Sequence, residues 1–365
     1  MRKYDKGLVA KIREKQYVKP VDGIDILMKP VPDAEREHAL DPRLKAVIEQ
    51  KAKMFKDRAV SGWKLSNERF RPDKVTYDIT DEPVCVDEFL IDVNGDHKID
   101  VFSYKTESAQ HDCPVLVYLH GGGFTAGDMR LFACQMKRIA EQSGAVVLFP
   151  EYRLAPECPY PGPIEDAFAT VEWAYAHATE LGADPQKLMV AGDSAGGALS
   201  AACVYKDEAG HIKRLMGIYP AYDMRRPCDQ DEYEWGYGAY DVVDDERELV
   251  FGRIDRIKCG MDEEDAATAS LYLQGKTAVD DPLVSALCSS DDVLSRYPET
   301  VIVSAEYDYL RIGSDQMAKR LASLGVPVRS IRYLGCDHGF LDMMGTIVQS
   351  EELCLTIADE LRAMA

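Results

Sequence analysis

KLMVAGDSAGGALSAACVY, residues 187–205, is the stretch of the chain that decides its fold. The apolar run 187–191 predicts a buried strand, and 198–205 predicts a helix, with a glycine-rich turn between them. A strand, a sharp turn and a helix around G-x-S-x-G are the setting of a nucleophilic serine, because glycine lacks the Cβ that would block so tight a turn. The helix N-terminus would also favour negative charge developing beside Ser194. We therefore predict that Ser194 is a nucleophile, and the alternative is an ordinary strand-to-helix turn.

A second glycine turn, HGGGF at residues 120–124, follows a predicted apolar strand. Attack on an ester creates an oxyanion, and three glycines let bare backbone N–H groups approach it. The alternatives are a plain turn or a phosphate-cradling loop. The spacing is not G-x-G-x-x-G and no Lys-Ser/Thr pair follows, which disfavours a nucleotide loop. We expect His120 to orient this loop rather than to act as the base.

Two later predicted strands end in polar residues that would complete the chemistry. Asp308 follows the first strand and His338 follows the second, and both loops should lie at the sheet edge that carries Ser194. In this order His338 takes the serine proton, while the carboxylate fixes the tautomer of the imidazole and stabilises the imidazolium. Glu306 is a competing acid and Asp337 a more remote one.

Taken together, these motifs resemble the hormone-sensitive-lipase-like branch of the α/β-hydrolases, over roughly residues 80–345. YRLAPE at 152–157 and DPLVS at 281–285 extend the resemblance. It implies an α/β-hydrolase fold: an eight-stranded, mostly parallel sheet with helices on both faces and a helical cap. It also implies esterase activity on short acyl esters.

The resemblance also implies roles for individual residues. By motif position it makes the catalytic triad of Ser194, Asp308 and His338, and it assigns the oxyanion N–H groups to Gly122, Gly123 and Ala195. The chain departs from the family pattern after the acid. Tyr309 stands where the family usually has proline, and Ile312 follows the Leu-Arg pair where an acidic residue is usual.

The rest of the chain fits this architecture. Predicted strands alternate with helices, at 114–119, 145–150, 187–191, 214–219, 299–305 and 328–334. This alternation predicts a parallel sheet covered on both faces, and Asn94-Gly95 predicts an antiparallel hairpin before it. We expect an N-terminal helical cap segment at 1–80, the α/β-hydrolase core in two parts at 81–223 and 281–365, and a cap insertion at 224–280.

The cap insertion begins with a run rich in tyrosine and acid, DEYEWGYGAY at 231–240. Over Ser194 this run could build an aromatic-lined pocket for the acyl or alcohol part of a substrate. The alternative is an acidic surface loop whose aromatic rings pack the cap on the core.

The composition of the chain limits the kinds of partner that it could bind. The net charge of −20 argues against nucleic acid and anionic membranes, and it mildly disfavours anionic substrates. No apolar run reaches transmembrane length and no hydrophobic signal core is present, so we expect a cytoplasmic protein without membrane insertion. The 10 cysteines lack C-x-x-C spacing, which is typical of reduced thiols. Cys336 is expected to pack, the alternative being a redox-sensitive thiol. We expect no metal site.

These observations predict a serine carboxylesterase that hydrolyses a small-molecule ester through a covalent acyl-enzyme, without a cofactor. One alternative is an amidase or peptidase on the same fold, because amide cleavage uses the same triad. The other is a ligand-binding protein without catalysis, which the presence of His338 disfavours. The sequence leaves a homo-oligomer open.

Overall fold

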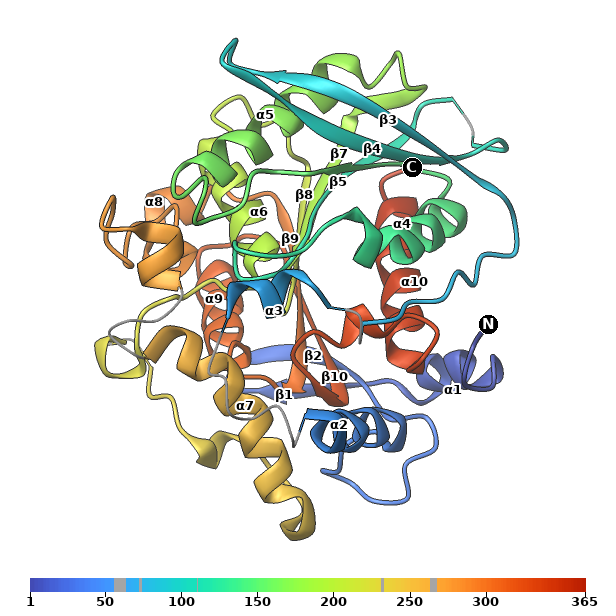
Figure 1. The fold of residues 1–365 in the computed structure, drawn as a ribbon, viewed down its shortest axis with the longest axis vertical. Helices are drawn as coiled ribbons and strands as arrows, with labels where there is room; N and C mark the ends of the chain where they lie inside the picture. The colour runs from blue at the N-terminus through green and yellow to red at the C-terminus, as the bar shows by residue number, and fades with distance from the viewer. Residues whose placement is uncertain (56–63, 72–73, 110, 231–232, 263–267) are drawn as a thin grey trace.

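The computed structural model describes residues 1–365 except 56–63, 72–73, 110, 231–232 and 263–267. Its centre is one sheet, whose strands are β1 (Tyr17–Val21), β2 (Ile24–Lys29), β3 (Val84–Val93), β4 (His97–Thr106), β5 (Cys113–Leu119), β6 (Val146–Pro150), β7 (Ala183–Asp193), β8 (Arg214–Ile218), β9 (Glu299–Tyr307) and β10 (Val328–Asp337). They lie in the order β1-β2-β10-β9-β8-β7-β5-β6-β4-β3 (Figure 1).

The strands from β5 to β10 pair in parallel, as the alternation of predicted strands and helices indicated. All residues of β5 are buried, because strands of a parallel sheet are covered on both faces and therefore consist of near-continuous apolar runs. β3 and β4 form the predicted antiparallel hairpin. Asn94 and Gly95 at its turn have φ of 56° and 73°, the positive values that a tight hairpin turn requires.

Five helices cover the two faces of the sheet: α4 (Met129–Ser143), α5 (Gly162–His177), α6 (Ala195–Lys206), α9 (Arg311–Ser323) and α10 (Val348–Arg362). α4 packs against α10 on one side, and α5 packs against α6 on the other (Figure 1). The ends of α4 show why this segment is helical. The Asp128 side chain accepts a hydrogen bond from Arg130 N at its start, and Gly144 in the left-handed region ends it.

The N-terminal segment expected to be helical also contains a hairpin. β1 and β2 pair antiparallel through a turn at Asp22 and Gly23, whose φ values are 48° and 91°. β2 then pairs in parallel with β10, so the sheet has two strands more than the eight that the resemblance implied. Asp-Gly between strand-like runs is a hairpin pattern, and the sequence analysis missed it.

Three helices lie beyond the carboxyl ends of the parallel strands, namely α2 (Pro42–Phe55), α3 (Leu65–Arg69) and α7 (Arg247–Asp262) (Figure 1). The remaining elements are α1 (Gly7–Lys15), η1 (Pro227–Asp229), η2 (Tyr237–Ala239), η3 (Asp244–Glu246), η4 (Thr268–Leu273), η5 (Ala286–Cys288), α8 (Asp291–Leu294) and η6 (Phe340–Met343). Each of the helices that the structure describes is too short or too polar to span a bilayer.

Candidate active site

Ser194 occupies the sharp turn between β7 and α6. Its φ of 54° and ψ of −120° are strained for a residue with a side chain, and such strain persists only where the surroundings hold it. Ser194 N donates to Ile218 O at 2.9 Å, which ties the turn to β8. A Cβ on Gly196 would collide with the carbonyl oxygen of Leu119, so only glycine permits α6 to approach β5 this closely. The serine hydroxyl is thus fixed at the N-terminus of α6.

The loops after β9 and β10 bring a carboxylate and an imidazole to this hydroxyl. His338 Nε2 lies 2.8 Å from Ser194 Oγ, and His338 Nδ1 lies 2.7 Å from Asp308 Oδ2. Asp308 is fully buried, and its other oxygen accepts a hydrogen bond from Leu310 N at 3.0 Å. The three side chains singled out in the sequence therefore form one continuous chain of hydrogen bonds, in which a proton can pass from the hydroxyl to Nε2.

The two other candidate acids have different partners. Glu306 is buried and accepts a hydrogen bond from Gly335 N at 2.7 Å, where the register of β10 shifts. Burial raises the pKa of Glu306 above its usual range. Asp337 Oδ2 accepts from Arg253 Nε of α7 at 2.6 Å. These carboxylates hold β10 and α7 in place.

The three residues expected to supply amides to an oxyanion are Gly122, Gly123 and Ala195. Gly122 has a φ of 135°, and a Cβ there would collide with the backbone of Ala126. Gly122 and Gly123 line the same cavity as Ser194, and Ala195 is the first residue of α6, whose N–H has no partner within a helix. Across the described residues, none of these three amides donates a hydrogen bond to the protein.

Asp193 connects the serine turn to the glycine loop, a role that was not predicted from the sequence. Its Oδ1 accepts hydrogen bonds from Gly121 N at 2.8 Å and from the hydroxyl of Tyr118 at 3.0 Å. Burial raises the pKa of Asp193 to about 7. The residue stands directly before Ser194, but its partners lie 72 and 75 positions away, so the motif alone could not reveal them.

His120 orients the glycine loop, in line with the prediction. It is fully buried, and its Nδ1 lies 2.8 Å from Gly121 O. The ring stacks on Tyr152 with centroids 4.3 Å apart, and the hydroxyl of Tyr152 donates to His120 O at 2.6 Å. Burial lowers the pKa of His120 to about 4, so the imidazole is neutral at physiological pH. It does not contact Ser194 in the structure.

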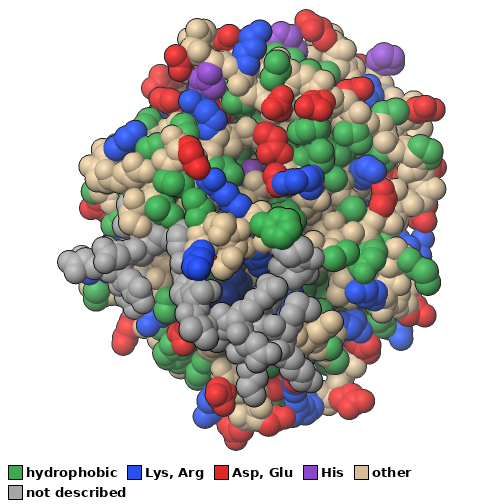
Figure 2. Space-filling model, in the orientation of Figure 1, with side chains coloured by type: hydrophobic (Ala, Val, Ile, Leu, Met, Phe, Trp, Pro, Cys, Tyr) green, Lys and Arg blue, Asp and Glu red, His purple; other side chains and the backbone are tan. Residues whose placement is uncertain are grey.

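Ser194 and His338 open into a cavity of about 1850 Å³. Its walls come from α2, α3 and α7 as well as from the glycine loop, and part of it is seen as a hollow on the face in Figure 2. The apolar side chains that line it include Val47, Ile48, Phe70, Leu131, Leu249, Ile257 and Met261. α7 was not predicted from the sequence.

The aromatic run of the cap insertion does not line this cavity in its described part, 233–240. Trp235 packs against Tyr309 with centroids 5.2 Å apart, and Tyr237 packs against Phe251 at 4.7 Å. The structure thus favours the alternative that these rings pack the cap on the core. Cys336 is likewise fully buried, and burial raises the pKa of its thiol well above the usual range, which favours packing over redox chemistry.

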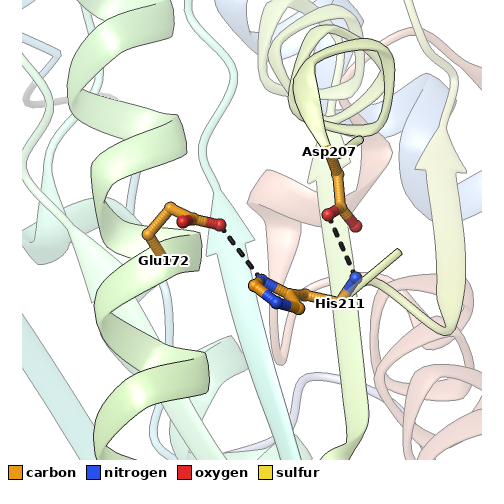
Figure 3. Close-up of side chains that lie close together, drawn as sticks. All are labelled: Glu172, Asp207 and His211. Atoms are coloured by element: carbon orange, nitrogen blue, oxygen red, sulfur yellow. Dashed lines mark hydrogen bonds and ion pairs between the residues drawn. The ribbon is translucent and has the colours of Figure 1, made fainter. Parts of the chain in front are cut away.

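Among the described residues, one group has the spacing of metal ligands, and it lies outside the cavity (Figure 3). His211 Nδ1 is 3.2 Å from Glu172 Oε1, and the His211 ring stacks on Tyr175 at 3.6 Å. The two oxygens of Asp207 accept hydrogen bonds from the backbone N–H groups of His211 and Ile212, at 3.0 and 2.7 Å. Asp207 therefore fixes the loop after α6.

The parallel sheet, the serine at the strand-to-helix turn and its hydrogen-bonded imidazole define a serine hydrolase. Residues 116–342 match the family model described as alpha/beta hydrolase fold, and the chain belongs to this family.

Comparison with similar proteins indicates which kind of serine hydrolase this chain resembles. Esterase LipI of Mycobacterium tuberculosis is 28% identical over 324 residues, which are 87% of this chain and 93% of LipI. Carboxylesterase NlhH of the same species is 29% identical over 310 residues, 83% of this chain and 89% of NlhH. A solved structure of an esterase from the bacterial hormone-sensitive lipase family has a TM-score of 0.68 at 25% identity and covers 89% of this chain and 99% of that one. The predicted resemblance to hormone-sensitive-lipase-like esterases is confirmed.

Proposed function

We propose that this protein is a carboxylesterase in which Ser194 is the nucleophile, His338 the general base and Asp308 the residue that orients the base. The hydrogen-bonded chain from Ser194 Oγ through His338 to Asp308, at 2.8 and 2.7 Å, carries the proposal. The esterase and carboxylesterase activities named for its relatives support it.

In the acylation step, Ser194 Oγ attacks the carbonyl carbon of the ester while His338 Nε2 accepts the hydroxyl proton. The carbonyl oxygen of the ester becomes an oxyanion, which receives hydrogen bonds from the amides of Gly122, Gly123 and Ala195. Their free N–H groups support this assignment, since no protein acceptor competes for them in the described part of the chain. When the tetrahedral intermediate collapses, His338 returns the proton to the leaving alcohol oxygen.

In the deacylation step, water takes the place of the alcohol. His338 removes a proton from the water, the hydroxyl oxygen attacks the acyl carbon, and Ser194 leaves with the proton restored. Asp308 stays ionised throughout, holding Nδ1–H of His338 and stabilising the imidazolium formed in each half of the reaction. The chemistry thus requires only this chain's own residues and water.

The part of the N-terminal segment 1–80 that follows β2 acts together with the insertion 224–280 as a cap. The core consists of 81–223, 281–365 and the hairpin of β1 and β2, which belongs to the sheet. Support comes from the cavity walls, since α2 and α3 belong to the first segment and α7 to the second. Their apolar side chains suit short acyl chains, which we take as the preferred substrates. The buried thiols of Cys203, Cys336 and Cys354 suit a reducing compartment such as the cytoplasm.

The test is a pair of assays on the purified full chain. A fluorophosphonate probe should label Ser194 in the folded protein, and p-nitrophenyl butyrate should be hydrolysed much faster than the matched butyryl p-nitroanilide. Labelling with faster anilide cleavage would make the protein an amidase. A folded protein that neither reacts with the probe nor cleaves the ester would overturn the proposal.

A further inference from the structure

The cavity that contains Ser194 is lined by seven cationic and seven acidic side chains, so the lining is balanced although the chain as a whole has a net charge of −20. The cations are Lys3, Lys45, Lys51, Arg71, Lys74, Arg253 and Arg256. In Figure 2, Lys and Arg side chains are visible inside the hollow and along its edge. A net charge describes the long-range field of the protein, whereas a ligand in a cavity responds to the charges within a few ångströms. The substrate charge that the site accepts therefore depends on which of these charged side chains lacks a partner.

Most of these cations already have a partner. Lys45 Nζ lies 2.8 Å from Glu246, Lys74 is paired with Asp342, and Arg253 is paired with Asp337. Lys3 lies over the ring of Tyr77, 5.0 Å from its centroid.

Arg256 differs from these side chains. Within the residues that the structure describes, its guanidinium makes neither an ion pair nor a hydrogen bond. The charged groups that act on it are Arg253, Asp337, Arg71 and Glu68. Both carboxylates among them are engaged, because Arg253 binds Asp337 at 2.6 Å and Arg71 binds Glu68 at 2.9 Å. Among these five groups, three guanidinium groups thus face two carboxylates, and Arg256 is the one that neither carboxylate binds.

Arg256 lies close in the structure to a residue that is bound to the His338 loop. It lies on α7 three residues after Arg253, so both project from the same face of the helix, about 4.5 Å apart along its axis. Arg253 is anchored to Asp337, the residue directly before His338. Arg256 therefore stands in the cavity wall one helical turn from a residue that is tied to the base.

The surroundings of Arg256 suit an anion. Its side chain is exposed, but it opens into the cavity, where neighbouring protein limits its hydration. Desolvation, with Arg253 close by, lowers the pKa of Arg256 to about 10, so the guanidinium is still charged at physiological pH. A bound anion would offset this unfavourable desolvation, and a carboxylate matches the guanidinium in both charge and planar geometry.

We propose that Arg256 selects esters that carry a second, ionised carboxylate, such as monoesters of dicarboxylic acids or acyl esters of hydroxy acids. This inference rests on the proposed esterase function and names the substrate class of the same site. One unpaired guanidinium fits the single charge of a carboxylate better than the double charge of a phosphate. Arg256 is a specificity-determining residue in this proposal and takes no part in proton transfer.

Matched esters test the proposal. Mono-p-nitrophenyl glutarate and p-nitrophenyl valerate have acyl chains of equal length, with and without a terminal carboxylate. 4-Acetoxybenzoate and its methyl ester place the same charge difference on the alcohol side. For at least one pair, the wild-type chain should prefer the anionic member.

Arg256→Gln should raise KM for that anionic ester about tenfold, the effect of losing one charged hydrogen bond near solvent. KM for the neutral ester of the pair should change less than twofold. Arg256→Lys should restore part of the preference.

Arg247→Gln is the matched control, because Arg247 lies on the same helix but is exposed, paired with Asp244 and absent from the cavity lining. This variant should leave every KM unchanged. Raising the ionic strength should weaken binding of the anionic ester alone. Equal effects of Arg256→Gln on charged and neutral esters, or no effect on either, would overturn the inference. If the wild-type chain cleaved none of the four esters, the proposed function itself would fail, which is a separate result.

Discussion

The loops at the ends of β7, β9 and β10 and the helix α7 line the same cavity, and they are built differently. In the loops, Asp308 is fully buried, His338 is 9% exposed, and the backbone of Ser194 is held at a φ of 54°. In α7, Arg256 and Cys259 are exposed. Among the described residues, one ion pair ties the helix to the base loop, from Arg253 to Asp337.

This contrast separates chemistry from selectivity. The loops require particular residues at fixed backbone angles, so a substitution there should change the rate of the reaction. The helix needs only to present side chains to the cavity, so a substitution there should change which substrates bind. The following predictions test this division, beginning with the largest expected effect.

Ser194→Ala should reduce kcat on p-nitrophenyl butyrate by about 10⁴–10⁶, because no other described hydroxyl lies against His338 Nε2. The melting temperature should not fall, since alanine removes only the hydroxyl. Circular dichroism and thermal unfolding serve as the folding controls. Turnover of even a tenth of wild type would show that another group is the nucleophile.

Asp308→Asn should lower kcat by about 10³–10⁴, since an amide stabilises the wrong tautomer of His338 and cannot stabilise the imidazolium. Glu306→Gln is the matched control, because Glu306, near the end of β9, is also a buried carboxylate but accepts its hydrogen bond from Gly335 N. Its kcat should fall less than tenfold. The reverse ranking, on the same ester and with both variants folded, would transfer the acid role to Glu306.

Asp193→Asn tests the carboxylate that joins the two catalytic turns. The pKa of Asp193 is raised to about 7 in the folded chain, above the value of ~4 of an unfolded aspartate. The folded state therefore binds the proton more tightly, and the stabilising contribution of protonated Asp193 is lost as pH rises from ~4 through 7. The Asn variant cannot titrate but keeps the acceptor oxygen for Gly121 N.

The measurement is the free energy of unfolding in urea at several pH values. Between pH 4 and pH 8, the wild-type chain should lose roughly 1–4 kcal/mol of stability relative to Asp193→Asn. Asp193→Ala removes the acceptor as well and should lower kcat about ten- to a hundredfold by releasing the glycine loop. A difference between wild type and Asn variant that stays constant with pH would contradict the raised pKa.

Glu246→Ala tests the role of the cap, and of the variants predicted here it should change the reaction rate least. Glu246 is buried and accepts hydrogen bonds from Leu40 N at 2.7 Å and Lys45 Nζ at 2.8 Å, so it joins the N-terminal segment to the insertion. Its loss should cost about 1–3 kcal/mol of stability, because the amide of Leu40 is left buried without a partner. KM for p-nitrophenyl butyrate should rise two- to fivefold, with kcat nearly unchanged, if the cap governs binding alone.

Asp245→Ala is the control for this variant, since the pair that the neighbouring Asp245 makes with Arg36, within the described part of the chain, is exposed. It should not change the melting temperature or KM. A large fall in kcat for Glu246→Ala would show that the cap contributes to the chemistry, and the division drawn above would then be wrong.

The division between the catalytic loops and the cap also separates what could be predicted from the sequence from what could not. The strands from β5 to β10 and the turn at Ser194 were predicted, because their patterns are local: an apolar run, then glycines, then a helix. The hydrogen bonds among Ser194, His338 and Asp308 follow from the parallel order of the strands, which brings their carboxyl ends to one edge.

The cap was less predictable because its structure depends on distant contacts. α7 meets the core through Arg253 and Asp337, which are 84 positions apart, and no local pattern indicates which face of the helix lines the cavity. The aromatic residues at 233–240 show the same limit. A tyrosine-rich run suits a pocket or a packed interface equally well, and the rings of Tyr309 and Phe251 decide for the interface.

The parallel pairing of β2 with β10 bears on how the chain is made. Ile26 is aligned with Ser330, so about 300 residues separate two neighbours in the sheet. The N-terminal hairpin leaves the ribosome long before its partner strand has been synthesised. The apolar side chains of Ile24, Ile26 and Met28, which are buried in the folded chain, are therefore exposed to solvent during synthesis. We expect the hairpin to be the last part of the sheet to close, and the nascent chain to be most prone to aggregation until Val328–Asp337 has emerged.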